Sequence, residues 1–216
     1  MIKTIRASKS EKILFIFLIC LSIFAFTSFF LLKNKCLFVE KNNLSNLYFN
    51  EPNNIAVMNV ECGNVIIQLY PDISPRTVER FKILIEKKMY DGSAFYKVSE
   101  NTFVQAGDIE YGNINNLDYS KIGSGKSGLG LLKSELSNDF KFTKGSVGFA
   151  RTVEFDTEDS EFFITLKEIP IYQGEYTPVG RVVYGLDILT KIKTGNKSIY
   201  VLRPDYIKTF RLLNSN

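Results

Sequence analysis

The chain has 216 residues, enough for one domain with an appendage or for two small domains. With 45% hydrophobic and 23% charged residues, its composition is that of a globular protein and excludes wholesale disorder. Of the net charge of +4, residues 1–12 contribute +3 and Lys33 and Lys35 add +2, which leaves about −1 for the rest. We therefore expect no nucleic-acid partner, because the main body lacks the basic surface that such binding needs.

Histidine is absent, which removes the commonest general base and the commonest metal ligand. Three cysteines remain, and Cys20 lies in an apolar run. Cys36 and Cys62 could form a disulfide if this part of the chain lies outside the cytoplasm, or they could remain two unpaired thiols.

Residues 13–32 form an apolar run without a single charge. A helix of this length spans about 30 Å, the thickness of the hydrocarbon layer of a bilayer. The alternative is a cleaved signal peptide, whose apolar region would be about 7–15 residues long and followed by small residues. Here the bulky residues 29–32 lead directly into Lys33. We expect an uncleaved transmembrane anchor that contacts the lipid bilayer through residues 13–32.

The charges that flank this run predict its orientation. Four basic residues precede it and two follow closely, so the excess of positive charge lies on the N-terminal side. The positive-inside rule then places residues 1–12 in the cytoplasm and the remainder beyond the membrane. We expect a single-pass protein of the inner membrane with its domain on the periplasmic side. Residues 33–54 are polar without a clear period and are predicted to be a tether.

From residue 55 onward the pattern indicates a domain that extends to residue 213. Residues 56–60 and 65–70 are rich in β-formers and flank a turn, which predicts a hairpin. Pro75 is predicted to begin a helix, with Ser74 as its N-cap and Asp91-Gly92 as its stop. Its apolar stripe consists of Val78, Phe81, Leu84, Ile85 and Met89.

The second half of the domain is predicted to contain long loops and short strands. Residues 107–145 are rich in glycine, serine and asparagine, which is typical of loops that cross between strands. Leucines and isoleucines spaced over 186–192 predict a short helix. Many strands, two helices and long loops favour a closed barrel. The predicted strands are 146–150, 162–166, 179–183 and 207–212.

Residues 123–127, Gly-Ser-Gly-Lys-Ser, look like the end of a phosphate-binding loop. The complete pattern requires a glycine at position 120, which is Ser120 here, and a buried strand before the loop. We therefore expect no nucleotide partner and interpret this stretch as a flexible glycine loop.

Several segments, in one order and spacing over residues 55–212, resemble the cyclophilins, and the details favour their bacterial branch. They are Pro75–Phe81, Asp91–Phe95, Gln105–Asp108, Glu135–Asn138, Lys144–Arg151, Phe162–Ile164, Tyr176–Arg181 and Gly180–Asp187. The resemblance implies a mainly β fold, a closed eight-stranded antiparallel barrel capped by two helices. Here one transmembrane helix precedes it.

Cyclophilins interconvert the cis and trans forms of X-Pro bonds and use neither a metal nor a cofactor. The resemblance implies that Lys97 and Gln105 are catalytic. Lys97 occupies the position of the family's arginine, and Gln105 matches a glutamine that orients this donor and the peptide carbonyl. Residues implied to bind the substrate are Phe95, Phe103, Ala150, Arg151, Glu161, Phe163, Tyr172 and Tyr176.

This chain departs from the family pattern at several positions. Lys97 keeps the positive charge but loses the planar fork of a guanidinium. Glu161 stands in place of a glutamine and could pair with Lys97 or Arg151. Ile171 or Tyr172 falls where an aromatic wall is usual. The other departures are Thr102 for a pocket phenylalanine and Tyr176 for a histidine.

Two functions follow from this pattern. The first is a membrane-anchored prolyl isomerase that acts on X-Pro bonds of proline-containing polypeptides during folding outside the cytoplasm. The second is a weakly active or inactive cyclophilin-like module that binds proline-containing segments of a partner protein. An ion pair between Glu161 and Lys97 that closes the pocket would favour the second.

Overall fold

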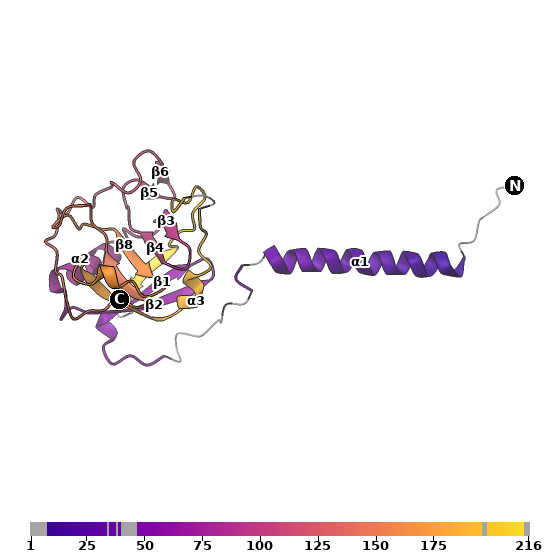
Figure 1. Ribbon diagram of the computed structural model, residues 1–216, viewed down its shortest axis with the longest axis horizontal. Helices are drawn as coiled ribbons and strands as arrows, with labels where there is room; N and C mark the ends of the chain where they lie inside the picture. The colour runs from indigo at the N-terminus through magenta and orange to yellow at the C-terminus, as the bar shows by residue number, and fades with distance from the viewer. Residues whose placement is uncertain (1–7, 34, 38, 40–46, 196–197, 214–216) are drawn as a thin grey trace. The chain divides into compact units, whose positions relative to one another are not determined.

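The computed structural model describes residues 8–33, 35–37, 39, 47–195 and 198–213, so part of the predicted tether and the whole of residues 1–7 lie outside it. The chain divides into two compact units, residues 1–38 and 39–216 (Figure 1). The second unit begins within the predicted tether, and its first residue, Val39, is buried. Each unit is described by itself.

The first unit contains one long helix, α1 (Lys9–Lys33). Its N-terminus is a capping box, in which the Ser8 hydroxyl accepts a hydrogen bond from Glu11 N–H and the Glu11 carboxylate accepts one from Ser8 N–H. The helix includes all of residues 13–32, and Lys9–Leu31 is long and apolar enough to cross a membrane. None of that apolar stretch is buried, so it is not a core helix.

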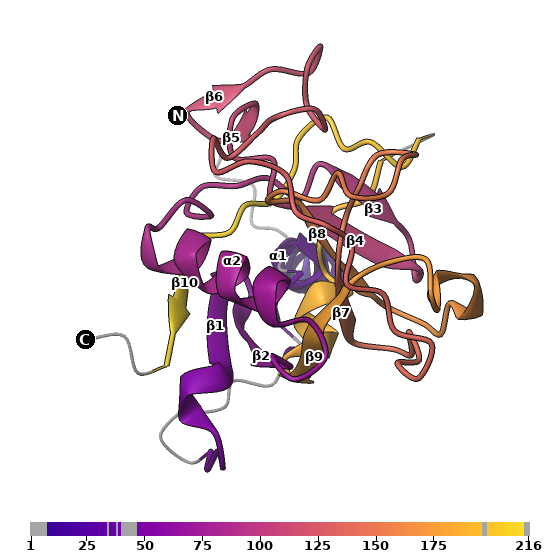
Figure 2. The same cartoon turned by 90° about the vertical axis from the view of Figure 1, so that its left-hand side faces the viewer.

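The second unit is built on an eight-stranded antiparallel sheet in the order β10-β1-β2-β9-β7-β8-β4-β3 (Figure 2). The predicted hairpin and all four later strands are confirmed, and two further short strands form a separate hairpin. The strands are β1 (Ile55–Val60), β2 (Gly63–Leu69), β3 (Lys97–Ser99), β4 (Phe103–Ala106), β5 (Gly112–Asn113), β6 (Asn116–Leu117), β7 (Ser146–Phe149), β8 (Phe162–Thr165), β9 (Pro178–Tyr184) and β10 (Thr209–Leu212).

The barrel is open, and the prediction of a closed one is wrong. β3 and β10 are the two edges of the sheet, and no ladder joins them among the described residues. The outer edge of β3 instead forms hydrogen bonds with the segment 199–201, which leads toward β10. Val98 N–H donates to the Ile199 carbonyl, and Val201 N–H donates to the Tyr96 carbonyl. This crossing segment covers an edge that would otherwise expose unpaired backbone groups.

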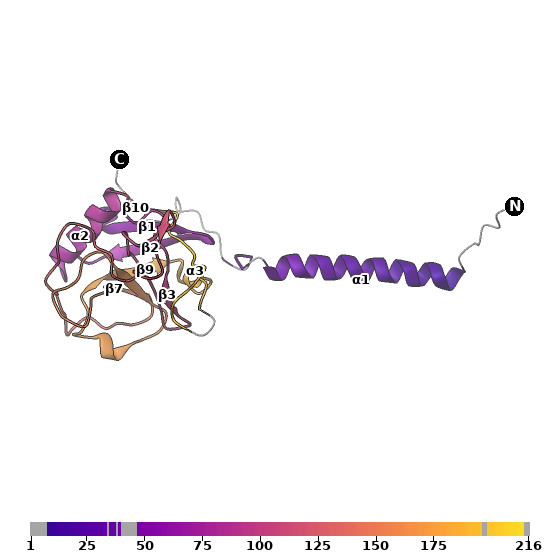
Figure 3. The ribbon, with the colours of Figure 1, turned by 90° about the horizontal axis from the view of Figure 1, so that it is seen from above.

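Two helices pack against the sheet, α2 (Pro75–Glu86) against β10 and α3 (Leu186–Leu189) against β2 (Figure 3). α2 begins at Pro75 with Ser74 at its N-cap, as predicted, but the Ser74 side chain makes no capping hydrogen bond, because its buried hydroxyl donates to the Pro178 carbonyl. The helix ends well before the predicted stop at Asp91-Gly92. Two 3-10 turns complete the fold, η2 (Pro52–Asn54) and η3 (Pro170–Tyr172).

The core beneath α2 is a cluster of aromatic rings. Phe81 of α2 lies with its ring centroid 5.2 Å from that of Phe162 in β8 and 5.5 Å from that of Phe210 in β10. Tyr90 is fully buried in the same cluster, and its hydroxyl donates to the Ser160 carbonyl over 2.7 Å. The core therefore fixes the backbone just before β8, where the predicted site segment begins.

Cys36 and Cys62 are each disulfide-bonded, whereas Cys20 is a free, exposed cysteine. Of the two alternatives for Cys36 and Cys62, the structure therefore has the disulfide-bonded state and not the unpaired thiols. Disulfides persist in oxidising compartments and are rare in the cytoplasm.

Candidate active site

A polar cavity of about 160 Å³ lies where β3, β4 and β8 meet. Five of the ten predicted site residues line it together: Lys97, Gln105, Ala150, Arg151 and Glu161. Its other walls come from the glycine loop at 122–126, from the segment 157–160 and from the crossing residue Tyr200. Segments that are far apart in the sequence thus converge on one small space.

The strand register explains why these side chains share a face. Lys97 of β3 lies directly opposite Gln105 of β4, and Gln105 lies directly opposite Phe163 of β8. Side chains that are opposed in an antiparallel ladder point to the same side, with Cβ atoms about 4.5–5.5 Å apart. The predicted donor, the predicted orienting amide and a predicted aromatic floor residue therefore form one row across the sheet.

Backbone contacts hold the ends of β4 and β8 together beside this row. The Ser160 hydroxyl donates to the Gly107 carbonyl over 2.8 Å, and Gly107 N–H donates to the Ser93 hydroxyl over 3.0 Å. Gly107 has a φ of +99°, and a Cβ there would lie 2.6 Å from the Ser160 carbonyl oxygen. Only glycine fits this approach, which places Gln105 next to Glu161.

Three side chains meet at the centre of the cavity. Gln105 Nε2 donates to the Tyr96 hydroxyl and to Glu161 Oε2, both over 2.8 Å. The Tyr96 hydroxyl in turn donates to Glu161 Oε2. The Gln105 amide nitrogen is therefore directed at the Tyr96–Glu161 pair, and one carboxylate oxygen accepts from two donors.

The electrostatics of this trio depend on burial. Burial raises the pKa of Glu161 above its ordinary value, and the charge of Asp108 adds to the shift. Hydrogen bonds from Tyr96 and Gln105 and the charge of Lys97 oppose it without cancelling it. The pKa of Tyr96 is raised as well, first by burial and then by the Glu161 carboxylate. The site therefore holds a carboxyl group that gains a proton more readily than an exposed glutamate.

Lys97 is only partly buried, and within the described part of the chain its ammonium group has neither an ion-pair nor a hydrogen-bond partner. Of the two pairings that the sequence allowed for Glu161, the one with Lys97 is not an ion pair among the described residues, although the charge of Lys97 acts on Glu161. Arg151 does not pair with Glu161 either, since its guanidinium bonds to the carboxylate and the carbonyl of Glu175. Lys97 is therefore a cationic donor of the cavity that is not committed to another residue, and the exposed Lys126 in the cavity wall is a second.

An aromatic cluster borders the polar cavity, and Ala150 belongs to both. The ring of Phe163 is nearly buried, with centroids 5.3 Å from Tyr172 and 5.1 Å from Tyr176. Phe103 and the buried Phe140 and Phe142 pack in the same cluster. Of the two candidates for the aromatic wall, Tyr172 packs against this cluster, whereas Ile171 is 78% exposed.

Arg151 closes the cluster on its outer side. Its guanidinium carbon lies 4.0 Å from the centre of the Phe155 ring and 5.1 Å from that of Tyr176. These contacts are cation–π interactions. Arg151 therefore positions the aromatic wall as well as lining the cavity.

Phe95 is not part of this site. Its side chain is fully buried, and it lines neither the polar cavity nor the aromatic cluster. The prediction that Phe95 binds substrate therefore gains no support from its position in the structure. The side chain belongs to the core beneath β3.

The glycine loop is held by a buried carboxylate. Asp108 accepts hydrogen bonds from Gly123 N–H over 2.6 Å and from Gly125 N–H over 3.2 Å. A Cβ on Gly125 would lie 2.0 Å from Asp108 Oδ1. Two backbone N–H groups of this loop are thus directed at a carboxylate of the protein itself.

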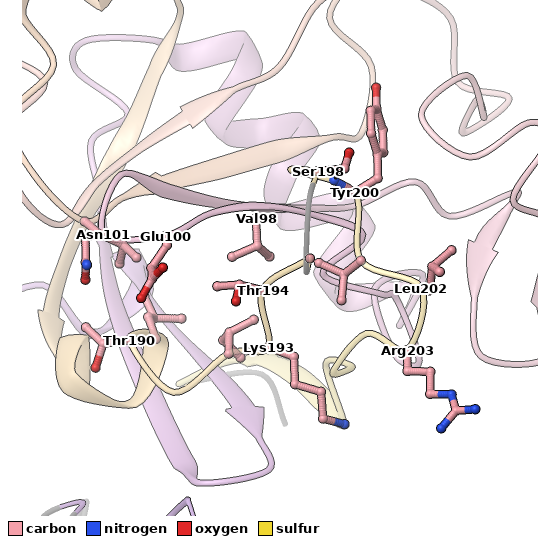
Figure 4. A pocket seen from close by; sticks show the side chains of 15 residues that line it. Val98, Glu100, Asn101, Thr190, Lys193, Thr194, Ser198, Tyr200, Leu202 and Arg203 are labelled. Carbon is pink, nitrogen blue, oxygen red and sulfur yellow. Dashed lines mark hydrogen bonds between the residues drawn. The ribbon is translucent and has the colours of Figure 1, made fainter.

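A larger cavity, of about 1150 Å³, lies on the other side of the crossing segment (Figure 4). Its lining includes the apolar Val98 and Val201 and the charged Glu100, Lys193 and Arg203. It contains none of the predicted site residues, although Tyr200 lines both cavities. We place the chemistry in the smaller cavity because the matched pair of donor and orienting amide lies there.

Sequence reasoning missed four residues that shape the site: Tyr96, Asp108, Phe142 and Tyr200. Asp108 lies within a matched segment and Tyr96 directly follows another, so their positions were visible but not their partners. The alternation of Phe140 and Phe142 was a weak signal within a stretch interpreted as loops. Tyr200 stacks on Tyr96 with ring centroids 6.3 Å apart, a contact across about a hundred residues that no local pattern predicts.

Comparison with known proteins agrees with this geometry. The family model described as cyclophilin type peptidyl-prolyl cis-trans isomerase/CLD matches residues 55–211. The chain belongs to the cyclophilin family. A probable peptidyl-prolyl cis-trans isomerase from Brucella suis is 35% identical over 149 residues, which are 68% of this chain and 76% of the relative. The peptidyl-prolyl cis-trans isomerase of Acinetobacter baylyi is 28% identical over 153 residues, with the same two coverages.

Solved structures show the same cyclophilin fold. A cyclophilin-type isomerase from Cryptosporidium parvum superposes with a TM-score of 0.65 at 23% identity, covering 76% of this chain and 98% of that one. A second structure of it, determined in the presence of the dipeptide Ala-Pro, gives 0.64 at 22% identity, with coverages of 75% and 99%. A cyclophilin from Hirschia baltica gives 0.63 at 19% identity and covers 74% of each chain.

Proposed function

We propose that this cyclophilin is a membrane-anchored prolyl isomerase that acts on X-Pro bonds of proteins outside the cytoplasm. The observation that carries the proposal is the uncommitted ammonium group of Lys97, opposite Gln105 and beside the aromatic cluster. The Ala-Pro dipeptide used with the Cryptosporidium relative supports a proline-containing polypeptide as the substrate.

The chemistry requires no nucleophile. Rotation about an amide bond has a barrier of about 18–20 kcal/mol, set by the resonance between nitrogen and carbonyl. In the twisted transition state the prolyl nitrogen regains a localised lone pair, which can accept a hydrogen bond. A donor placed at that nitrogen stabilises the transition state more than either ground state, and so lowers the barrier. Lys97 is the residue that we assign to this role.

The remaining site residues hold the peptide. The aromatic cluster around Phe163, Tyr172 and Tyr176 offers an apolar surface to the pyrrolidine ring. Gln105 orients the donor, and Ala150 leaves room for the peptide backbone beside the cavity. Arg151 holds the outer wall. The small volume of the cavity suits a single residue next to the proline, with the rest of the chain outside.

The proposal also includes attachment to a membrane and a domain on its periplasmic side. The apolar helix α1 supports attachment to a bilayer, although a signal sequence shares its length and composition. The basic residues before the helix and the disulfide-bonded state of Cys36 and Cys62 support a domain on the periplasmic side. Protease treatment of spheroplasts tests this location: the domain should be digested from outside while its N-terminus stays protected.

A prolyl-isomerase assay on the full chain in detergent micelles tests the activity. A panel of X-Pro peptides is used with wild-type protein and Lys97→Ala, and the exposed Lys144→Ala serves as the matched control. Removing one positioned donor from a site costs about 10²–10³ in rate, so Lys97→Ala should fall toward the lower end of that range while Lys144→Ala stays at wild-type level.

The outcomes separate the two functions that the sequence allows. Turnover that is lost in Lys97→Ala assigns the donor. A folded wild-type protein without turnover would instead indicate a module that only binds proline-containing segments. The ion pair that this second function called for is absent among the described residues, which is why we prefer the isomerase.

A further inference from the structure

The loop of residues 152–157 follows directly after Arg151 and presents two apolar side chains that the proposed reaction does not use. Val153 is 88% exposed, and Phe155 is 48% exposed. Single apolar side chains on a surface are common, but a pair of them beside a binding cluster indicates an interaction surface. The position of this pair relative to the aromatic cluster decides what it can contact.

Arg151 connects the loop to the aromatic cluster. Its nearly buried side chain contacts two rings, with the guanidinium carbon 4.0 Å from the centre of Phe155 and 5.1 Å from that of Tyr176. The edges of the guanidinium are engaged too, since Nη1 donates to the Val153 carbonyl over 3.0 Å and Nη2 to the Glu175 carboxylate over 3.2 Å. The Phe155 ring is therefore held next to the cluster, with half of its surface open to solvent.

Hydrogen bonds within the loop and to a neighbouring segment fix its shape. Thr152 N–H donates to the Thr157 hydroxyl over 3.0 Å, and Glu154 N–H donates to the Thr152 hydroxyl over 3.2 Å. Ser134 N–H donates to the Asp156 carboxylate over 2.8 Å, and Asp156 N–H donates to the Ser134 hydroxyl over 3.0 Å. A partner that binds a loop of fixed shape loses little free energy in ordering it.

An extended peptide whose proline lies on the aromatic cluster can reach Phe155. The surface assigned to the proline ring consists of Phe163, Tyr172 and Tyr176. The ring centres of Phe163 and Tyr176 are 5.1 Å apart, and Arg151 spans the gap from Tyr176 to Phe155. An extended chain advances about 3.3–3.6 Å per residue, so Phe155 lies within about four residues of the proline.

The two sides of the loop differ in chemistry. Thr152 and Thr157 line the polar cavity, whereas Phe155 lies against Arg151 beside the aromatic cluster. An apolar side chain laid on the Phe155 ring removes both surfaces from water, which is favourable. A carboxylate there would lose hydration without gaining a partner, because Arg151 is already paired with Glu175. The ring therefore favours an apolar side chain over an acidic one.

We propose that Phe155, with Val153 beside it in the loop, is a second contact site for the substrate polypeptide and takes a large apolar side chain within about four residues of the proline. The occupant is the substrate chain itself, because the site is continuous with the surface assigned to its proline. The inference rests on the proposed function and names its substrate class, X-Pro segments with an apolar residue nearby. Such residues are exposed in chains that have not finished folding.

The experiment uses the full chain in lipid nanodiscs and a panel of labelled X-Pro peptides. The reference peptide has alanine around the X-Pro bond, and each other peptide has one leucine placed two, three or four residues before or after the proline. The isomerase assay gives kcat/KM, and fluorescence anisotropy gives Kd. Wild type should favour leucine over alanine about fivefold, on one side of the proline only, because Phe155 lies at one end of the cluster.

Three variants test whether Phe155 is the cause of this preference. Phe155→Ala should reduce the leucine-to-alanine ratio below about twofold, and Phe155→Leu, which keeps an apolar side chain, should retain most of it. Ile114→Ala is the matched control, since Ile114 is exposed in the turn between β5 and β6, and should leave the ratio at the wild-type value. Both peptides use the same proline surface, so a general loss of activity cancels in the ratio.

Each outcome supports or overturns the second contact site. A ratio that is the same in wild type and Phe155→Ala would overturn it, as would an equal preference on both sides of the proline. A loss in Phe155→Leu as large as that in Phe155→Ala would indicate a purely structural role of the ring and overturn it too. If a folded protein turns over no peptide, the proposed function fails, and the ratios of Kd still decide the contact site. A ratio independent of Phe155 in a protein whose turnover depends on Lys97 overturns this inference alone.

Discussion

The polar cavity and the aromatic cluster lie side by side but are held by different forces. In the cavity, Tyr96, Gln105 and Glu161 are held by hydrogen bonds to one another, so replacing one of them changes the hydrogen bonds of the other two. In the cluster, Phe163 and its neighbours are fixed by shape and by the loss of contact with water. The cavity carries the departures from the family pattern at positions 97 and 161, whereas the cluster keeps its apolar character.

This difference separates the control of rate from the control of stability. A packed cluster tolerates exchange of one ring for another but loses free energy when a ring is removed. A hydrogen-bonded trio contributes little net stability, yet it determines which atom faces the substrate. We therefore expect substitutions in the cluster to change unfolding first and substitutions in the cavity to change catalysis first.

The largest effect should come from removing the central ring of the cluster. Phe163→Ala takes away a nearly buried side chain that touches three other rings, so the free energy of unfolding should fall by about 3–5 kcal/mol. KM for an X-Pro peptide should also rise. Urea unfolding followed by circular dichroism measures the loss, with the exposed Phe155→Ala as the matched control. Equal losses for the two variants would contradict the packing argument.

A smaller loss is expected from overfilling the same cluster. At Gly148 a Cβ would lie 2.5 Å from Phe163 Cζ and 2.9 Å from Phe142 Cε1, and both rings are buried. Gly148→Ala should therefore cost about 1–3 kcal/mol. Combining it with Phe142→Leu makes room, so the double variant should lose less than the two single losses added together. Additive losses in urea unfolding would show that the Phe142 ring is not the cause.

The cavity predicts a dependence of stability on pH. The pKa of Glu161 is raised in the folded protein. The protonated form of Glu161 therefore adds to the free energy of unfolding, and this contribution is lost as the pH rises through the raised pKa. Glu161→Gln lacks this loss. The melting temperature of Glu161→Gln should thus exceed that of wild type at neutral pH, and the two should converge toward acid pH. A difference that is constant across the pH range would argue against a titrating Glu161.

The smallest effect on stability should come from the tyrosine hydroxyl of the trio. Tyr96→Phe removes one donor to Glu161 and one acceptor for Gln105 while the ring keeps its stack on Tyr200. The free energy of unfolding should fall by about 1 kcal/mol. A thermal melt measures the change, and Tyr48→Phe, at a 91% exposed position, should show none.

The sequence by itself determined the elements whose signals are local. The uncharged run at 13–32 predicted the helix now seen as α1, and the Gly63 hairpin and the start of α2 at Pro75 were read from turn and breaker residues. The order of motifs predicted the family and named Lys97, Gln105 and Phe163 as candidate site residues. These features depend on residue type and spacing along the chain, which are explicit in the sequence.

Only the tertiary structure decided which partners those residues have. The barrel is open, and the segment 199–201 bonds along β3. The Ser74 hydroxyl donates to the Pro178 carbonyl, and Phe95 is buried. Glu161 accepts hydrogen bonds from Tyr96 and Gln105 instead of pairing with Lys97. Each of these outcomes joins residues that lie far apart in the chain or depends on which competing donor is nearer. Such choices are settled by packing and by the satisfaction of buried polar groups, which local sequence patterns do not encode.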